Sequence, residues 1–171
     1  MGLIAEIGEG PAALGTTAFN YWIAESPAYL DAIAPVFRAA DGGDIESVSS
    51  ALTLLEVLVV PCRAGDLGLA ERYEALLTRS RGVRLIDIDT GQLRDAAQLR
   101  ALDGVRTPDA LQLAAALAAR CPVFVTNDRS LPAIPGLRIL QLRDYAKKRV
   151  TWSDASHSPR AVSIPSARSQ P

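Results

Sequence analysis

The sequence has little of the chemistry that many enzymes use, because it contains a single histidine and two cysteines among 171 residues. His157 lies in a Ser- and Pro-rich C-terminal stretch, which excludes a serine–histidine–aspartate triad or a histidine metal site in the rest of the chain. Cys62 and Cys121 lack the CxxC spacing of zinc and redox sites, and we expect both to be small core residues. Catalysis by this chain would therefore depend on carboxylates.

Long apolar runs and an excess of one charge are missing as well. No run approaches the roughly eighteen apolar residues of a membrane span, and Glu6 and Glu9 stand where a secretory signal would be basic and then apolar. We therefore expect a cytoplasmic protein. Lys and Arg total 18 and Asp and Glu total 19, so a nucleic-acid partner would have to be bound locally rather than attracted by net charge.

The length and the hydrophobic content of 49% predict one folded domain with chain left over at both ends. Residues 1–10 mix Gly and Glu without periodicity, and the last stretch is rich in Ser, Pro and Arg. We expect flexible tails over 1–10 and 146–171, and a folded domain over 11–145.

Short β-branched runs alternate with longer helical patterns along this domain, which predicts an α/β fold with a parallel sheet. A short apolar segment ending at Leu14 and Gly15 is the first strand, and Thr16 and Thr17 are candidate N-caps of the next helix. Further strands are expected at 45–49, 83–89, 122–126 and 137–142, and helices at 28–40, from 51 to a bend or end at Pro61, at 67–78, 93–102 and 107–119.

Three acids stand where parallel sheets place their ligands, beyond the carboxyl ends of the strands. Asp128 directly follows a strand, Asp109 opens a helix, and Glu56 lies among the aliphatic residues of another helix. Together they would form an oxygen-only, anionic pocket suited to Mg²⁺ or Mn²⁺. The cation would offset the repulsion between the carboxylates and support hydrolysis of a phosphodiester.

Each acid also has an ordinary structural explanation. Asp109 suits the first turn of a helix because of the helix dipole, and Asp128 in TNDRSL suits a turn. Glu56 is unusual inside LTLLEVLVV, although Arg63 is placed to pair with it.

Two other classes of small α/β protein place acids at strand ends. A response-regulator receiver needs a lysine after a late strand, whereas the only lysines are Lys147 and Lys148. A haloacid-dehalogenase-type phosphatase needs DxDxT after its first strand, but DIDTG at 87–91 lies mid-chain with its Thr one position early. We therefore expect Asp87 and Asp89 to be a solvent-facing strand residue and a helix cap.

Three segments, SALTLLEVLV (50–59), RTPDALQLAAALA (106–118) and VFVTNDRSL (123–131), together resemble a known family. They are similar to the PIN-domain endoribonucleases, most closely to VapC-type toxins of bacterial toxin–antitoxin modules. The resemblance implies a three-layer α/β/α domain with a central parallel sheet that cleaves RNA with Mg²⁺ or Mn²⁺. It also implies a homodimer and an antitoxin partner.

By motif position, Glu56, Asp109 and Asp128 match three of the four acids that hold the metal and carry out catalysis in this family. Thr17 and Thr126 match polar residues of the same pocket. These roles rest on the resemblance.

The first acid of the family pattern is missing. A pattern like LDTxxFIYxIE reads LGTTAFNYWIAE here, with Gly15 in place of the aspartate. A tight turn would explain the glycine structurally.

Glu25 lies one position beyond the glutamate of the family pattern. One residue turns a side chain by about 100° around a helix, which argues against Glu25 replacing the missing acid directly and leaves only a water-mediated role. We therefore expect a weak metal site and low nuclease activity; the alternative is a PIN-like domain that binds RNA or an antitoxin without cleavage.

Two kinds of residue are candidates for contacts with partners. Arg106 and Arg129 are the arginines nearest to the acids in sequence, which makes them candidates for RNA binding. Apolar residues on the second helix could form a dimer or antitoxin groove or, more commonly for such stripes, part of the core: Tyr29, Leu30, Val36 and Phe37.

Overall fold

The computed structural model describes residues 2–146 of the chain. The expected C-terminal tail, which includes His157, lies outside the described residues except for Ala146. Within the described part, no helix combines the length and the apolar character needed to cross a membrane.

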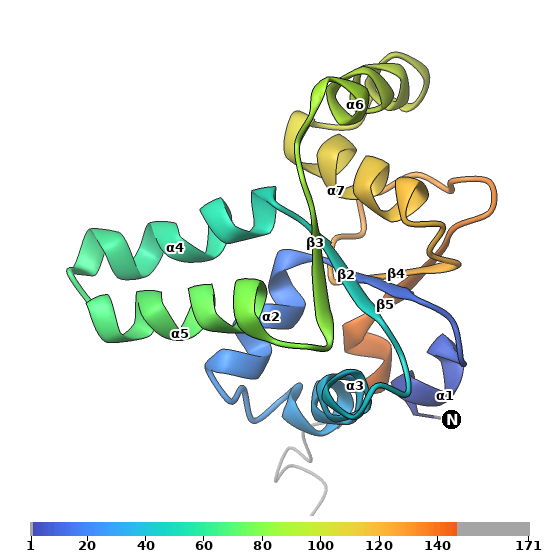
Figure 1. Cartoon of the computed structure of the whole chain (residues 1–171). Coiled ribbons are helices and arrows are strands. Elements are labelled where there is room, and N and C mark those ends of the chain that lie inside the picture. Colours follow the sequence, from blue (N-terminus) through green and yellow to red (C-terminus); the bar gives the residue numbers. More distant parts are fainter. Residues whose placement is uncertain (1, 147–171) are drawn as a thin grey trace, which may run out of the picture.

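Five parallel strands form the central sheet, in the order β3-β2-β1-β4-β5 (Figure 1). The strands are β1 (Ala12–Leu14), β2 (Ser47–Ser50), β3 (Val83–Ile86), β4 (Val123–Thr126) and β5 (Arg138–Gln141). The helices are α1 (Leu3–Ile7), α2 (Thr16–Ile23), α3 (Leu30–Gly42), α4 (Leu52–Ala64), α5 (Leu67–Arg79), α6 (Thr90–Asp103) and α7 (Thr107–Ala118), and a 3₁₀ turn η1 covers Leu142–Tyr145. The predicted three-layer α/β/α fold with a parallel sheet is confirmed.

Strand β1 lies in the middle of the sheet and is buried on both faces. Ala12 and Leu14 point into the core formed with α1, α2 and α3, whereas Ala13 points into the core formed with α6 and α7. This alternation follows from the two-residue period of a strand. Small and aliphatic side chains on both faces therefore allow helices to pack on each side, as expected for a buried parallel strand.

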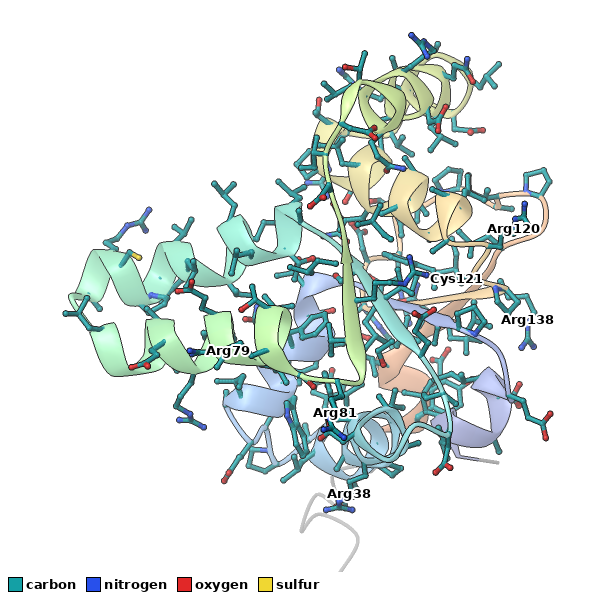
Figure 2. All side chains as sticks on the ribbon, in the orientation of Figure 1. Arg38, Arg79, Arg81, Arg120, Cys121 and Arg138 are labelled. Atoms are coloured by element: carbon teal, nitrogen blue, oxygen red, sulfur yellow. The ribbon has the colours of Figure 1, made fainter. Side chains whose placement is uncertain are left out.

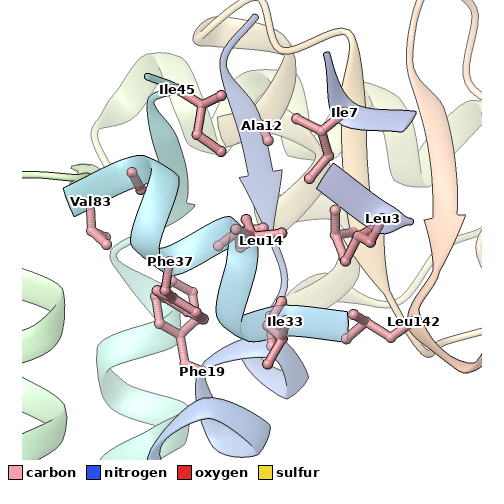
Figure 3. Close-up of a cluster of buried hydrophobic side chains, with 14 of the residues drawn as sticks. Leu3, Ile7, Ala12, Leu14, Phe19, Ile33, Phe37, Ile45, Val83 and Leu142 are labelled. Atoms are coloured by element: carbon pink, nitrogen blue, oxygen red, sulfur yellow. The ribbon is translucent and has the colours of Figure 1, made fainter. Parts of the chain in front are cut away.

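Aromatic side chains connect α2 to α3 (Figure 3). The ring centroids of Phe19 and Phe37 are 5.5 Å apart in an edge contact, and Trp22 stacks on Phe37 at 5.1 Å. Val36 and Phe37 are 0% and 1% exposed, so of the two roles considered for these residues they take the commoner one, in the core, whereas Tyr29 and Leu30 are half-buried. The packing fixes the position of α2, the helix that begins after Gly15.

The N-terminal residues do not form the predicted flexible tail. Leu3 and Ile7, one helical turn apart, are 1% and 4% exposed and pack in the same core as α3 through the short helix α1. A five-residue helix is too short to show a periodic pattern, which is why the sequence did not indicate it.

Helix α4 does not end at Pro61, which was one of the two outcomes expected there. The helix continues to Ala64 and stops at Gly65, whose φ of 68° is left-handed. The buried face is Thr53, Val57 and Pro61. Three aliphatic residues of the helix are exposed: Leu55, Val59 and Val60.

The two cysteines lie in different surroundings. Cys121 is buried beside β4, as predicted, and burial raises the pKa of its thiol to about 11 (Figure 2). Cys62 is exposed on α4, so the prediction that it is a core residue is wrong.

Arg38 on α3 and Arg138 on β5 are exposed and project from separate parts of the surface (Figure 2).

The burial of α1 yields a stability prediction. Leu3→Ala should reduce the free energy of unfolding by about 2–3 kcal/mol, because it leaves a cavity against α3. Leu55→Ala, a matched change at a residue that is 64% exposed, should cost less than about 0.5 kcal/mol. Urea unfolding of both variants measures this, and equal losses would contradict the packing of α1.

Candidate functional site

The carboxyl ends of β1 and β4 bring the first elements of the site together. The backbone N–H of Gly15 donates to the carbonyl of Val125 at 2.9 Å, directly beyond the end of β1. Gly15 is the N-cap residue of α2, with φ −74° and ψ 164°, and no side-chain cap bond is made. The prediction that Thr16 or Thr17 caps α2 is therefore wrong, because both lie inside the helix.

A pocket of about 170 Å³ opens at this edge of the sheet. Its lining comes from α2 and the residue before it, from α4 and α7, and from β4 and the loop that follows it. It consists of Gly15, Thr16, Thr17, Glu56, Asp109, Gln112, Phe124, Thr126, Asp128 and Leu131. The three acids singled out in the sequence thus lie around one pocket, beside the glycine. The structure also brings the two predicted supporting threonines, Thr17 and Thr126, into its wall.

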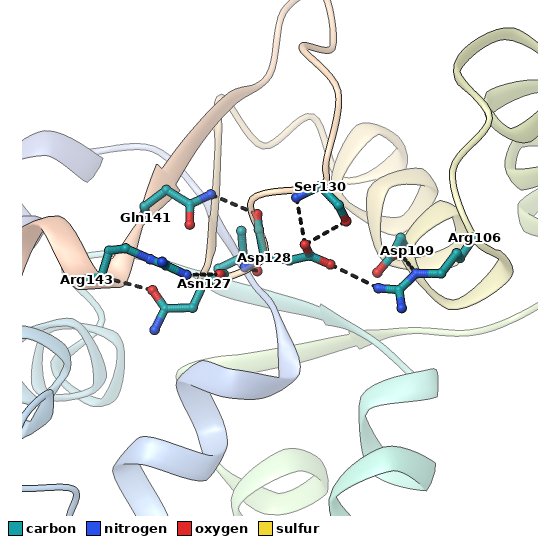
Figure 4. A network of polar contacts seen from close by, with 8 residues as sticks. Arg106, Asp109, Asn127, Asp128, Ser130, Gln141 and Arg143 are labelled. Carbon is teal, nitrogen blue, oxygen red and sulfur yellow. Dashed lines mark hydrogen bonds and ion pairs between the residues drawn. The ribbon is translucent and has the colours of Figure 1, made fainter.

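Arg106 connects two of the acids (Figure 4). Its Nε donates to Asp109 Oδ2 at 2.9 Å, and its second guanidinium nitrogen donates to Asp128 Oδ2 at 3.1 Å. The Arg106 side chain is 74% exposed, whereas those of Asp109 and Asp128 are 19% and 30% exposed. The guanidinium is not part of the pocket lining. It lies in a neighbouring depression that Asp109 also lines, and it neutralises part of the negative charge of the two acids.

Ser130 holds the other oxygen of Asp128. Its backbone N–H and its hydroxyl donate to Asp128 Oδ1 at 2.8 and 2.7 Å. These bonds and the positive charge of Arg106 lower the pKa of Asp128, with Ser130 as the larger cause. The same contacts raise the pKa of Arg106, chiefly through Asp109. Asp128 is therefore held ionised and fixed in orientation.

Glu56 is held on the opposite wall by neutral groups. The hydroxyl of Thr16 donates to Glu56 Oε2, and the amide of Gln112 lies 3.4 Å from the same oxygen. Gln112 also donates to Thr53 at 2.8 Å. Thr16 and Gln112, rather than the predicted Arg63, are the partners of this carboxylate.

Two polar oxygen atoms in the pocket wall are buried without a hydrogen-bond partner in the protein. They are Oγ1 of Thr17 and Oε1 of Gln112. Buried polar atoms are nearly always paired, so these oxygens indicate a place for water or a polar ligand.

The sequence analysis did not single out Gln112 as a pocket residue. A polar residue one helical turn after Asp109, inside the apolar run LQLAAALAA, is a signal that could have indicated it.

The oxygen atoms of the pocket are of the chemical type that binds a hard divalent cation, but its three acidic side chains are too far apart to share one. Carboxylate and hydroxyl oxygens are the ligands that Mg²⁺ and Mn²⁺ prefer. However, no group of three or more acidic, histidine or cysteine side chains between residues 2 and 146 is close enough to hold a metal ion. Arg106 already occupies one oxygen of Asp109 and one of Asp128.

Two predicted residues lie outside the pocket lining. Glu25 is exposed just after α2 and lines a separate depression with Trp22 and Arg72, so it cannot replace the missing acid directly. Arg129 is exposed beside Asp128 but is not part of the pocket wall. Asp89 caps α6 by accepting from Gln92 N–H at 2.8 Å, as expected.

The family of the chain follows from comparison with known proteins. Residues 13–137 match the family model of the PIN domain, a range that includes every residue lining the pocket and the sheet from Ala13 up to the start of β5. The chain belongs to the PIN domain family. A search of curated proteins gave no significant match.

Solved structures share the fold. The chain is similar to VapBC2 from Rickettsia felis bound to a promoter DNA fragment, with a TM-score of 0.61, 18% identity, and coverage of 77% of this chain and 98% of the other. It is also similar to DNA-bound VapBC from Salmonella typhimurium, with a TM-score of 0.55, 24% identity, and the same 77% and 98% coverage. At these identities the likeness establishes the fold.

The contacts of Asp128 yield a pH prediction. Ser130→Ala should raise the pKa of Asp128 toward its ordinary value, because one donor to the ionised form is lost. A lowered folded-state pKa gives stability that is present above the unfolded-state pKa and is lost as the pH falls through the folded-state pKa. The variant should therefore lose about 1 kcal/mol or less near neutral pH and nothing in strong acid.

NMR titration of the carboxyl groups measures the pKa of Asp128, and urea unfolding near neutral pH and in strong acid measures the loss of stability. Ser80→Ala, which removes a similar bond to Asp41 far from the pocket, is the matched control and should leave the Asp128 titration unchanged. An unshifted Asp128 titration in Ser130→Ala would contradict the assigned cause.

Proposed function

We propose that this chain is a VapC-type PIN-domain endoribonuclease that hydrolyses RNA phosphodiester bonds with low activity. The observation that supports this most is the convergence of Glu56, Asp109 and Asp128 around one pocket beside Gly15. Membership of the PIN family, whose members are typically nucleases, supports it independently. Low activity follows from the missing acid and from the pairing of two carboxylates with Arg106.

The proposed catalytic and metal-binding residues are Glu56, Asp109 and Asp128. PIN domains generally depend on a divalent metal, and Mg²⁺ or Mn²⁺ would supply charge stabilisation and water activation. Thr17 and Thr126 are proposed as supporting residues, because both lie in the pocket wall. Their oxygens can orient a water or a phosphate oxygen.

Arg106 and Arg129 are proposed to contact the RNA. Both are exposed, Arg106 pairs with two of the acids and Arg129 directly follows Asp128 in the chain, and a guanidinium group matches the geometry of a phosphate. The near-neutral total charge favours recognition of RNA shape over non-specific attraction.

An antitoxin and a second copy of this chain are the proposed protein partners. The VapBC complexes that share the fold support an antitoxin. The homodimer is carried over from the family resemblance, and the cytoplasmic location is the one expected from the sequence. Exposed Leu55, Val59 and Val60 on α4 offer an apolar surface for such a contact, whereas Val36 and Phe37 on α3 belong to the core.

A non-catalytic PIN domain that binds RNA or an antitoxin is the second candidate. The observation that favours it is Gly15, at the position of the first acid. Its φ of −74° is accessible to any residue, so a tight turn does not require glycine here. A Cβ at this position would approach the carbonyl oxygen of Val125 at 3.3 Å and the Phe124 ring at 3.4 Å, so a small shift would accommodate it.

Restoring the acid separates the two candidates. Gly15→Asp with Mn²⁺ should cleave structured RNA at least about tenfold faster than the present chain, equivalent to about 1.4 kcal/mol of barrier. Gly15→Asn has nearly the same shape without the charge and should give no gain. Cleavage of labelled RNA, resolved on denaturing gels, measures the rates.

A further substitution shows whether the gain arises in this pocket. Asp128→Asn in the Gly15→Asp background should abolish the gain, because it removes a second proposed ligand. If neither the Gly15→Asp variant nor the present chain cleaves RNA, while RNA binding is retained, the non-catalytic function is the better account.

A further inference from the structure

Arg106 places a positive charge at an unusual position. It is the N-cap residue of α7, and its backbone carbonyl accepts the N–H of Ala110 at 2.9 Å. The N-terminus of a helix carries partial positive charge, so a cation there is unfavourable unless acids compensate it. Asp109 in the first turn of α7 and Asp128 beyond β4 supply that compensation.

The contacts make Arg106 a bridge between the two carboxylates. Two different guanidinium nitrogens donate to Asp109 Oδ2 and Asp128 Oδ2. Ser130 donates to Oδ1 of Asp128, which leaves Oδ2 for the arginine. One positive charge thus lies against the oxygens that a divalent cation would need. The backbone is fixed by the helix, but the side chain is 74% exposed and can leave without disturbing the core.

We propose that Arg106 is the resident cation of two of the acids that line this pocket: from the adjoining depression it holds Asp109 and Asp128 in place of a metal ion, and a divalent cation binds these oxygens only by displacing it. The guanidinium relieves the repulsion that the acids would otherwise experience. It also explains why the pocket has oxygen ligands of the kind that a hard cation prefers, although no three acidic side chains of the described residues lie close enough to bind one. The inference rests on the proposed function for the identity of the competing ion.

The test compares Mn²⁺ binding to the full-length chain and to Arg106→Gln, without RNA. Free Mn²⁺ is followed by electron paramagnetic resonance during a titration at low ionic strength. Arg106→Gln should bind Mn²⁺ about tenfold more tightly, because the ion no longer competes with a fixed positive charge. Mn²⁺ should also raise the unfolding midpoint of Arg106→Gln more than that of the present chain.

Arg84→Gln is the matched control. Arg84 makes two bonds to Glu46, of 2.7 and 3.0 Å, so this change removes the same charge and a similar ion pair away from the pocket. It should leave Mn²⁺ affinity unchanged.

Equal or weaker Mn²⁺ binding by Arg106→Gln would overturn the proposal, as would an equal gain in Arg84→Gln. Absence of Mn²⁺ binding to both the present chain and Arg106→Gln would overturn it too. Because no RNA is present, tighter Mn²⁺ binding combined with failure of Gly15→Asp to cleave RNA would reject the nuclease and retain the role of Arg106.

Discussion

Mutual repulsion between carboxylates is the constraint on which the site depends. Glu56, Asp109 and Asp128 come from three separate elements and line one pocket. Such groups can share a pocket only if donors and positive charge compensate them. Thr16 and Gln112 donate hydrogen bonds to Glu56. Ser130 and Arg106 donate to Asp128, and Arg106 also donates to Asp109. These contacts therefore determine much of the local structure of the pocket.

The sheet provides the geometry for that compensation. Parallel strands end at the same edge, which places Gly15 after β1 beside the segment that leads from β4 to Asp128. The core contacts of Phe37 hold α2, and with it the hydroxyl of Thr16, against Glu56 on α4. The apolar cores therefore position polar groups that they do not contact directly.

The architecture and the convergence of the acids could be predicted from the sequence, whereas the partners of the acids could not. Alternating periodicities and the acids after strand ends indicate the fold and the edge of the site. The bonds from Gln112 to Thr53 and from Ser130 to Asp128 depend on side-chain orientation, which sequence spacing does not specify. Helix α1 is too short for a periodic signal, and the apolar run of α4 conceals which of its faces is buried.

The ordinary backbone conformation of Gly15 has a genetic consequence. Codons for glycine and aspartate can differ by a single base, and the main-chain φ at this position is accessible to other amino acids, with a small shift needed to accommodate a Cβ. An ancestral acid could be lost or regained here by one point mutation with little change elsewhere in the fold. Where the glycine codon is GGT or GGC, a single G-to-A change would give a fully acidic pocket.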